Sequence, residues 1–189
     1  MKKFLVIGNP IEHSLSPMLH NYWINNNNIR AIYEKQKLNE NELEKIILQI
    51  KEKKINGVNI TVPFKKTIIP FLDELSAEAE NTQSVNTLYL KGNKIIGHNT
   101  DIFGFETSIK KSKFDVLNKE VLILGAGGVV PSIIFALNKM KVSKIKISNR
   151  TKEKAENLKK LFNNIELIKW GEVPDFDIII NATSIGLKK

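Results

Sequence analysis

The sequence predicts an α/β protein with two domains, the first built on a mostly parallel sheet. Short apolar segments alternate with amphipathic segments along the whole chain. Such a succession of strands and helices favours right-handed crossovers and parallel neighbouring strands. A glycine-rich turn at residues 125–128 follows an apolar segment and precedes a helical pattern, as in nucleotide-binding βα turns. We therefore expect domains at 1–101 and 102–189.

Strands and helices alternate in the first domain. Ser16 and Pro17 form a good helix start, with serine as N-cap and proline at the first helical position, and asparagines 25–28 end this helix. An amphipathic helix is predicted at 39–54, with Leu43, Ile46, Ile47 and Ile50 on one face. The remaining predictions are strands at 3–8, 31–37 and 58–62, helical pieces at 66–72 and 76–81, and a hairpin of 85–90 and 94–98.

The second domain repeats the alternation but contains few strands. Its predicted strands are 120–124, 144–148, 165–168 and 176–180, and its helices are 102–113, 131–139 and 152–162, the last capped by Thr151. A doubly wound dinucleotide-binding domain needs more strands than these. We expect an incomplete Rossmann domain in a chain truncated at its C-terminal end.

Composition excludes several classes of protein. The 189 residues are 42% hydrophobic, enough for a buried core, but no apolar run approaches the length that spans a bilayer. Cysteine is absent, and the three histidines are scattered, so neither a disulfide nor a metal site is expected. We predict a soluble cytoplasmic protein without a membrane partner.

The net charge of +9 invites a nucleic-acid hypothesis. Only Arg30 and Arg150 are arginines, the lysines are interleaved with glutamates, and no aromatic platform accompanies them. We therefore predict no nucleic-acid partner. A nucleic-acid binder would show steep salt dependence.

The segment 58–65 has the features of a strand that delivers a lysine to a site. Asn59 and Thr61 alternate with apolar residues, and Pro63 stops the strand because it has no N–H to donate. Lys65 follows at the carboxyl end, where open α/β sheets bind ligands. Taken alone, a lysine after a turn is more often simply solvated.

The glycine turn and the next strand end indicate which dinucleotide binds. Gly125 and Gly127 stand between strand and helix as in the dinucleotide fingerprint, although Val130 occupies its third position. NAD sites usually carry a carboxylate about 20 residues beyond the glycines, where this chain has Asn149, Arg150 and Thr151. A guanidinium suits a phosphate, with Lys154 one turn further on, so we favour NADP. Thr151 as a mere cap and Arg150 as an exposed loop residue remain the alternative.

Taken together, these motifs strongly resemble the shikimate dehydrogenase family. The matching segments run in family order and cover nearly the whole chain. They are residues 8–10, 14–17, 57–65, 84–87, 99–104, 125–128, 149–151 and 181–183. The resemblance implies reversible NADPH-dependent reduction of 3-dehydroshikimate to shikimate, a step of chorismate and aromatic amino acid biosynthesis.

The resemblance also implies residue roles. Ser14 and Ser16 would hold the substrate carboxylate, and Lys65 and Asp101 would be the catalytic pair and would also contact substrate. The ring hydroxyls would be bound by Asn59, Thr61, Asn86 and Asp101. The cofactor would be bordered by Gly125, Ala126, Gly127, Gly128, Val129, Asn149, Arg150, Thr151, Lys154, Asn181, Ala182, Thr183 and Ser184.

Helix capping and turn formation remain local alternatives for the serines and the other polar residues. In the family, the nucleotide domain continues further and the chain adds a substrate-binding glutamine. These segments lie outside the 189 residues, so we expect the intact protein to be an enzyme and leave the activity of this fragment as a separate question. Other hypotheses are a quinate/shikimate dehydrogenase using NAD and an inactive binding module. A homodimer is compatible with the resemblance.

Overall fold

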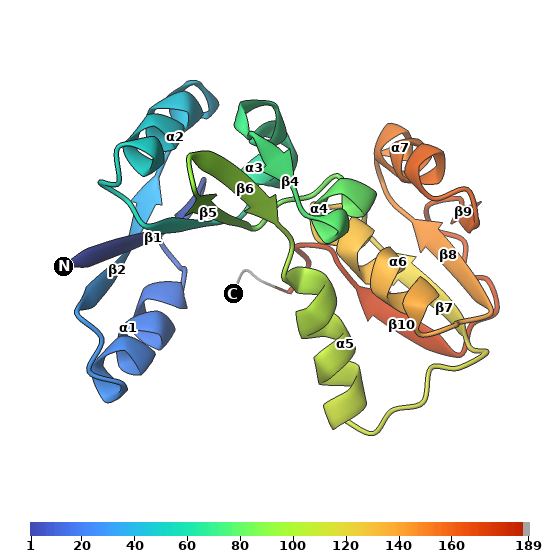
Figure 1. The fold of residues 1–189 in the computed structure, drawn as a ribbon. Coiled ribbons are helices and arrows are strands. Elements are labelled where there is room, and N and C mark those ends of the chain that lie inside the picture. The colour runs from blue at the N-terminus through green and yellow to red at the C-terminus, as the bar shows by residue number, and fades with distance from the viewer. Residues whose placement is uncertain (187–189) are drawn as a thin grey trace. The chain divides into compact units, whose positions relative to one another are not determined.

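A computed structural model of the chain describes residues 1–186. The chain divides into two compact units, residues 1–100 and the part that begins at Asp101 (Figure 1). The elements of the first unit are β1 (Lys2–Gly8), α1 (Ser16–Asn26), β2 (Ala31–Lys37), η1 (Glu40–Glu42), α2 (Leu43–Lys51), β3 (Gly57–Ile60), α3 (Phe64–Thr67), η2 (Ile69–Phe71), β4 (Glu74–Leu75), α4 (Ala77–Thr82), β5 (Thr87–Lys91) and β6 (Lys94–His98).

The first unit is built on a six-stranded sheet in the order β2-β1-β3-β5-β6-β4. β1 pairs in parallel with both β2 and β3, and β5 is antiparallel to its two neighbours. The sheet is therefore mostly parallel, as predicted. The chain leaves β1 for β2 on one side and later places β3 on the other, so the strand order reverses beside β1.

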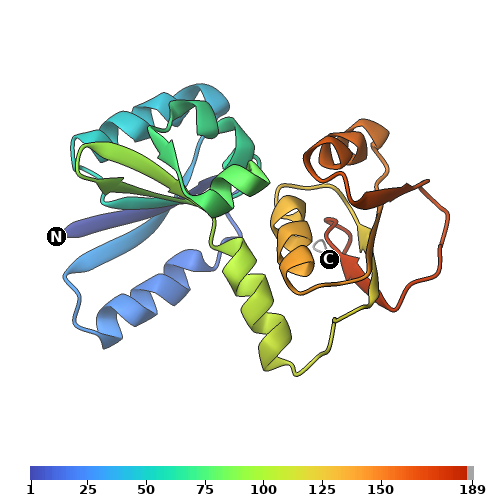
Figure 2. The same cartoon turned by 45° about the vertical axis from the view of Figure 1, so that its right-hand side comes forward.

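Helices cover both faces of this sheet, with α1 and α2 on opposite sides (Figure 2). Successive residues of β1 serve the two faces because side chains alternate along a strand. Leu5 and Ile7 pack in one core cluster with α2, whereas Val6 packs in another with Ile24 of α1 and Tyr33 of β2. Two apolar layers thus fix β1 at the centre of the unit.

The predicted helix at 39–54 is shorter in the structure. Asn39 and Glu42 form a capping box, in which the Asn39 backbone N–H donates to Glu42 Oε2 at 2.8 Å, and a 3₁₀ turn precedes α2. The apolar face was predicted correctly, since all four of its residues are buried: Leu43, Ile46, Ile47 and Ile50.

The strand predicted at 58–62 ends early, at Ile60. Thr61 begins a turn in which the Phe64 N–H donates to the Thr61 carbonyl at 3.0 Å. The apolar alternation fails at Val62, whose side chain is 57% exposed. Lys65 consequently lies in the short helix α3 rather than directly on the strand end.

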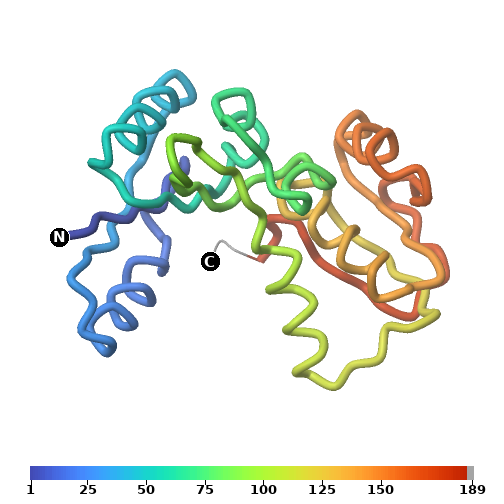
Figure 3. The backbone as a smooth tube through the Cα atoms, viewed as in Figure 1, coloured from blue at the N-terminus to red at the C-terminus, as the bar shows by residue number. Residues whose placement is uncertain are grey.

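The second unit contains a four-stranded, wholly parallel sheet in the described residues, in the order β10-β7-β8-β9. A long connection at 112–119 leads from α5 into β7 (Figure 3). The strand order reverses between β7 and β10. The elements are α5 (Asp101–Lys111), β7 (Glu120–Leu124), α6 (Val130–Lys139), β8 (Lys144–Ser148), α7 (Lys152–Leu161), β9 (Ile165–Ile168) and β10 (Ile178–Asn181).

The core of the second unit joins α6 and α7 to β7 and β8 in one apolar cluster. Val130, at the third position of the glycine fingerprint, is fully buried in this cluster. A valine here therefore packs into the contact between helix and sheet, where the fingerprint usually has a small residue. No helix in residues 1–186 is long and apolar enough to cross a membrane.

Candidate active site

The first unit has a pocket of about 260 Å³ where the strand order reverses beside β1. Ligands of open α/β sheets bind at such reversals, outside the carboxyl ends of the strands. Three of the predicted substrate-binding residues meet here, two from the loop after β1 and one from the end of β3. The lining residues are Val6, Pro10, Ile11, His13, Ser14, Ser16 and Thr61.

The segment 11–17, here called the serine loop, includes the first two residues of α1 and carries two of these hydroxyls. The Ser16 backbone N–H donates to Ser14 Oγ at 3.3 Å, and the Ser14 N–H donates to the Ile11 carbonyl at 3.1 Å. Leu15, not Ser16, occupies the N-cap position of α1, so the predicted cap is wrong by one residue. Ser16 is instead the first residue of the helix.

Glycine at position 8 lets the end of β1 approach the segment after β3 closely. A Cβ on Gly8 would lie 2.5 Å from Thr61 Cγ2 and 2.9 Å from the Val62 carbonyl oxygen. The Asn9 N–H donates to that same carbonyl at 2.9 Å. The absence of a side chain at Gly8 therefore sets where Thr61 stands in the pocket.

Glu12 ties the serine loop to β2. Its carboxylate forms an ion pair with Lys37 at 3.0 Å and accepts the Ile11 N–H at 2.9 Å. Hydrogen bonds from its own backbone, from Lys37 and from the Ile11 backbone lower the pKa of Glu12 to about 2. The loop is thus anchored by a carboxylate that stays ionised well into the acid range.

Asn59 is held by Tyr33 of β2, which lies beyond β1 in the sheet, and by two residues at the start of β5. Its Oδ1 accepts the Tyr33 hydroxyl at 2.7 Å, and its Nδ2 donates to Thr87 Oγ1 at 3.1 Å and to the Asn86 carbonyl at 3.2 Å. Burial raises the pKa of Tyr33, so its hydroxyl remains a proton donor to Asn59. These bonds fix the amide of Asn59, while its contact with substrate stays a prediction.

Asn86 and Thr100 continue this network toward the start of α5. Asn86 Oδ1 accepts the Thr100 backbone N–H at 3.0 Å and the Thr87 hydroxyl at 3.0 Å. Asp101 follows directly as the first residue of α5. The orientation of the Asn86 amide is thereby set by groups on two adjoining segments.

Lys65 lies half-buried in α3, beside the segment that leads to Asn86. The Val85 N–H donates to the Lys65 carbonyl at 2.8 Å. Lys65 and Asp101 belong to different compact units, so their pairing stays a prediction.

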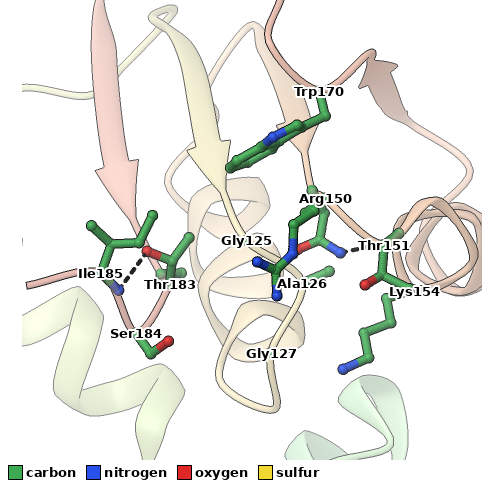
Figure 4. Close-up of a pocket in the computed structure, with 12 residues that line it drawn as sticks. Gly125, Ala126, Gly127, Arg150, Thr151, Lys154, Trp170, Thr183, Ser184 and Ile185 are labelled. Atoms are coloured by element: carbon green, nitrogen blue, oxygen red, sulfur yellow. Dashed lines mark hydrogen bonds between the residues drawn. The ribbon is translucent and has the colours of Figure 1, made fainter. Parts of the chain in front are cut away.

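The second unit has a pocket of about 290 Å³ around the glycine loop (Figure 4). The pocket lies at the carboxyl ends of β7, β8 and β10, and ten of the predicted cofactor residues line it. These are Gly125, Ala126, Gly127, Asn149, Arg150, Thr151, Lys154, Ala182, Thr183 and Ser184, joined by Trp170 and Ile185.

Arg150 and Lys154 make this pocket cationic. Among the described residues that line it there is no carboxylate. The Asn149 side chain donates to the Thr151 carbonyl at 2.7 Å and closes the turn that presents Arg150. A carboxylate at this position would favour a ribose 2′-hydroxyl, whereas two cations at a helix start favour a 2′-phosphate.

Three predicted cofactor residues, Gly128, Val129 and Asn181, are not among the lining residues. Asn181 instead shapes the wall after β10. Its Oδ1 accepts both the backbone N–H of Thr183 at 3.0 Å and the Thr183 hydroxyl at 2.7 Å. Thr183 Oγ1 in turn accepts the Ile185 N–H at 3.1 Å. Direct cofactor contacts of these three residues stay predictions.

Sequence reasoning missed some lining residues, namely His13 in the first pocket and Trp170 and Ile185 in the second. His13 precedes Ser14 directly, and Ile185 follows Ser184. Trp170 comes just after β9, so its place at the carboxyl edge of the parallel sheet was the available signal.

A curated protein from Pelagibacter ubique (strain HTCC1062), named Shikimate dehydrogenase (NADP(+)), is 65% identical over 188 residues. The match covers 100% of this chain and 71% of the relative. The chain belongs to the shikimate dehydrogenase family. The shikimate dehydrogenase of Caldicellulosiruptor saccharolyticus, also named as NADP(+)-dependent, is 39% identical over 99% of this chain and 70% of its own length.

Both units carry matches to models of this family. Residues 6–88 match the shikimate dehydrogenase substrate binding domain, and residues 108–186 match shikimate / quinate 5-dehydrogenase. The first match contains the serine loop and Lys65, and the second contains the glycine loop and Arg150. Each pocket therefore lies within a segment that the shikimate dehydrogenase family shares.

Solved shikimate dehydrogenases have the same fold. The structure from Aquifex aeolicus is 39% identical, with a TM-score of 0.90 over 100% of this chain and 71% of that one. The Thermus thermophilus enzyme, solved in complex with NADP(H) and shikimate, is 29% identical, with a TM-score of 0.88 over 99% and 70% of the two chains. The fold therefore agrees with the predicted substrate domain followed by a Rossmann-type domain.

Proposed function

We propose that this protein catalyses the reversible NADPH-dependent reduction of 3-dehydroshikimate to shikimate, in chorismate and aromatic amino acid biosynthesis. The observation that carries the proposal is the pair of pockets at strand-order reversals. The pocket of the first unit carries hydroxyls, which suit a carboxylate on a polyhydroxylated ring. The pocket of the second unit combines a glycine loop with Arg150 and Lys154 and suits a dinucleotide phosphate.

Substrate binding is assigned to polar groups of the first unit and to Asp101. Ser14 and Ser16 donate hydroxyl hydrogen bonds to the substrate carboxylate. Their position beside Thr61 in one pocket supports this role. The ring hydroxyls are bound by Asn59, Thr61, Asn86 and Asp101, and the fixed amides of Asn59 and Asn86 support the assignment.

Lys65 is the proposed proton donor. When NADPH is bound, it supplies the hydride that reaches the carbonyl carbon. Negative charge then develops on the carbonyl oxygen, and an ammonium that donates a proton there lowers the barrier. The proposed role of Asp101 is to position this ammonium.

The cofactor is assigned to the pocket of the second unit. The backbone N–H groups of Gly125–Gly127 and of the start of α6 bind the pyrophosphate, and Gly128 and Val129 complete the loop. Asn149, Arg150, Thr151 and Lys154 hold the adenosine side with its 2′-phosphate. Asn181, Ala182, Thr183 and Ser184 border the cofactor at the end of β10.

Quinate is the second substrate to consider, because the family matched by residues 108–186 is described for both shikimate and quinate. Rates of NADP or NAD reduction at 340 nm with shikimate and with quinate separate the alternatives. We expect the shikimate–NADP pair to give the highest kcat/KM. A highest value for quinate with NAD would replace the proposal.

Lys65 has a matched control in Lys66, its exposed neighbour in α3. Lys65→Ala should lower kcat about a hundredfold or more, with a much smaller change in shikimate binding, whereas Lys66→Ala should leave both near wild type. Near-normal turnover of Lys65→Ala would remove Lys65 from the chemistry.

The cytoplasmic location and the homodimer stay predictions. Cell fractionation would test the location, and sedimentation would test the homodimer.

A further inference from the structure

Trp170 stands at the edge of the second pocket, in the turn directly after β9. Its side chain is 45% exposed and is not part of the apolar cluster of this unit. Figure 4 shows the indole projecting over the space between Arg150 and the segment that carries Thr183 and Ile185. A large aromatic ring that is nearly half exposed in this position does not serve the core.

The turn that carries Trp170 is fastened to the strand that presents Arg150. Ser148, the last residue of β8, is buried and donates its hydroxyl to the Lys169 carbonyl at 3.4 Å. The Glu172 N–H donates to the same carbonyl at 3.1 Å, and Gly171 takes a φ of +94° to close the turn. The ring is thus placed relative to Arg150 by backbone and buried side-chain contacts.

The chemistry of the wall changes along the pocket. Arg150 and Lys154 supply positive charge, and the glycine loop supplies open backbone. Trp170 supplies the flat apolar surface, and Ile185 adds a smaller one. A nucleotide base stacks well on an aromatic face, and the stacking energy is lost when the ring is removed.

We propose that Trp170 is the stacking surface for the adenine ring of the cofactor and a determinant of cofactor affinity. The proposal rests on the proposed function, because it takes NADP as the ligand of this pocket. In this arrangement the indole covers the adenine while Arg150 and Lys154 hold the phosphate on the adjoining ribose. The nicotinamide half of the cofactor gains nothing from Trp170.

The test uses Trp170 as its own reporter. Trp23→Phe removes the other tryptophan, which lies in α1 of the first unit. The remaining fluorescence is titrated with NADP, with adenosine 2′,5′-bisphosphate and with nicotinamide mononucleotide. We expect quenching by the first two ligands and no change with the third.

Affinity variants complete the test by calorimetry. Trp170→Ala should weaken binding of NADP and of adenosine 2′,5′-bisphosphate about tenfold or more, and Trp170→Phe should recover most of the loss. Val173→Ala, an 81% exposed site on the same loop outside the lining residues, should change neither affinity. Circular dichroism checks that the variants fold.

The outcomes separate this proposal from the proposed function. Unchanged affinities in Trp170→Ala, or equal quenching by nicotinamide mononucleotide, would overturn the stacking role while leaving NADP as the cofactor. Failure of the unaltered protein to bind either NADP or adenosine 2′,5′-bisphosphate would overturn both.

Discussion

Two glycines in the loop after β7 have different physical tasks. Gly125 has a φ of +111°, and a Cβ there would lie 2.8 Å from the Ala182 carbonyl oxygen. At Gly127 the nearest atom to such a Cβ is 3.9 Å away, which is ordinary contact. Gly125 is therefore required by the fold, whereas the space above Gly127 is available to a ligand.

Alanine at each position separates these tasks. Gly125→Ala should destabilise the protein by about 1–3 kcal/mol in urea unfolding, because it strains the backbone and meets the Ala182 carbonyl. Gly127→Ala should unfold like wild type and yet bind NADP about tenfold more weakly, since the methyl group occupies the approach of the pyrophosphate. Unimpaired NADP binding by Gly127→Ala would argue against the pyrophosphate site.

Arg150 should decide between the two dinucleotides, because a guanidinium can form paired bonds to a 2′-phosphate that NAD lacks. Arg150→Ala should raise the KM for NADP about tenfold to a hundredfold, the range expected for lost charge-assisted hydrogen bonds. The KM for NAD should change little. Arg30→Ala, at an exposed arginine of the first unit, is the matched control, and equal losses with both cofactors would contradict the assignment.

The serine loop is an element whose position depends on charge. Lys35 and Lys37 of β2 both reach Glu12, one through its carbonyl and one through its carboxylate. Before the loop, the lack of a side chain at Gly8 lets the end of β1 lie against Thr61. Ser14 and Ser16 therefore follow a residue, Glu12, that two lysines of β2 hold in place.

The pKa of Glu12 gives this anchor a pH dependence. Because the folded pKa is about 2 and the ordinary value is 4.5, its stabilisation is complete above pH 4.5 and is lost as pH falls toward 2. The free energies of unfolding of wild type and Glu12→Gln should differ at pH 6 and converge by about pH 2. Lys37→Met should remove only part of the difference, because backbone N–H groups also bind the carboxylate. A difference that stays constant from pH 6 to pH 2 would contradict the anchor.

Local patterns predicted most elements because the information for them is local. The ranges of β2, β7 and β8 were predicted as they stand, since each is a short run bounded by turn residues. The early end of β3 could not be predicted. The last bond from this segment to β1 runs from the Thr61 N–H to the Ile7 carbonyl at 3.0 Å, so the end of the pairing involves a residue far away in the chain.

In the site, too, some residues were predicted from local motifs and others depend on residues far away in the chain. Ser14, Ser16 and Arg150 belong to short motifs, and the structure places them at the two pockets. Trp170 lines its pocket because β9 pairs with β8. Tyr33 contacts Asn59 because β2 and β3 lie on either side of β1, and the tyrosine side chain is long enough to reach across it. Contacts of this kind arise from sheet order, which no local pattern contains.

At the scale of the whole molecule, each unit has its own core and its own pocket. The clusters around Leu5 and Val6 lie in the first unit, and the cluster around Val121 lies in the second. Both units have a sheet in which the order of the parallel strands reverses beside the strand that precedes the binding loop. The two ligands of the proposed reaction are therefore assigned to separately stabilised parts.

This separation predicts where each ligand slows amide hydrogen exchange. A ligand at 100 times its Kd stabilises the unit that binds it by about 2.7 kcal/mol, so core amides that exchange through unfolding of that unit should slow about a hundredfold. Shikimate should protect the β1 and β3 amides, and NADP those of β7 and β8. At the same NADP concentration, Arg150→Ala should reduce the NADP effect to a slowing of about twofold to tenfold and keep the shikimate effect. If either ligand alone protected both cores equally, the units would unfold as one cooperative body, and their independent stabilisation would be excluded.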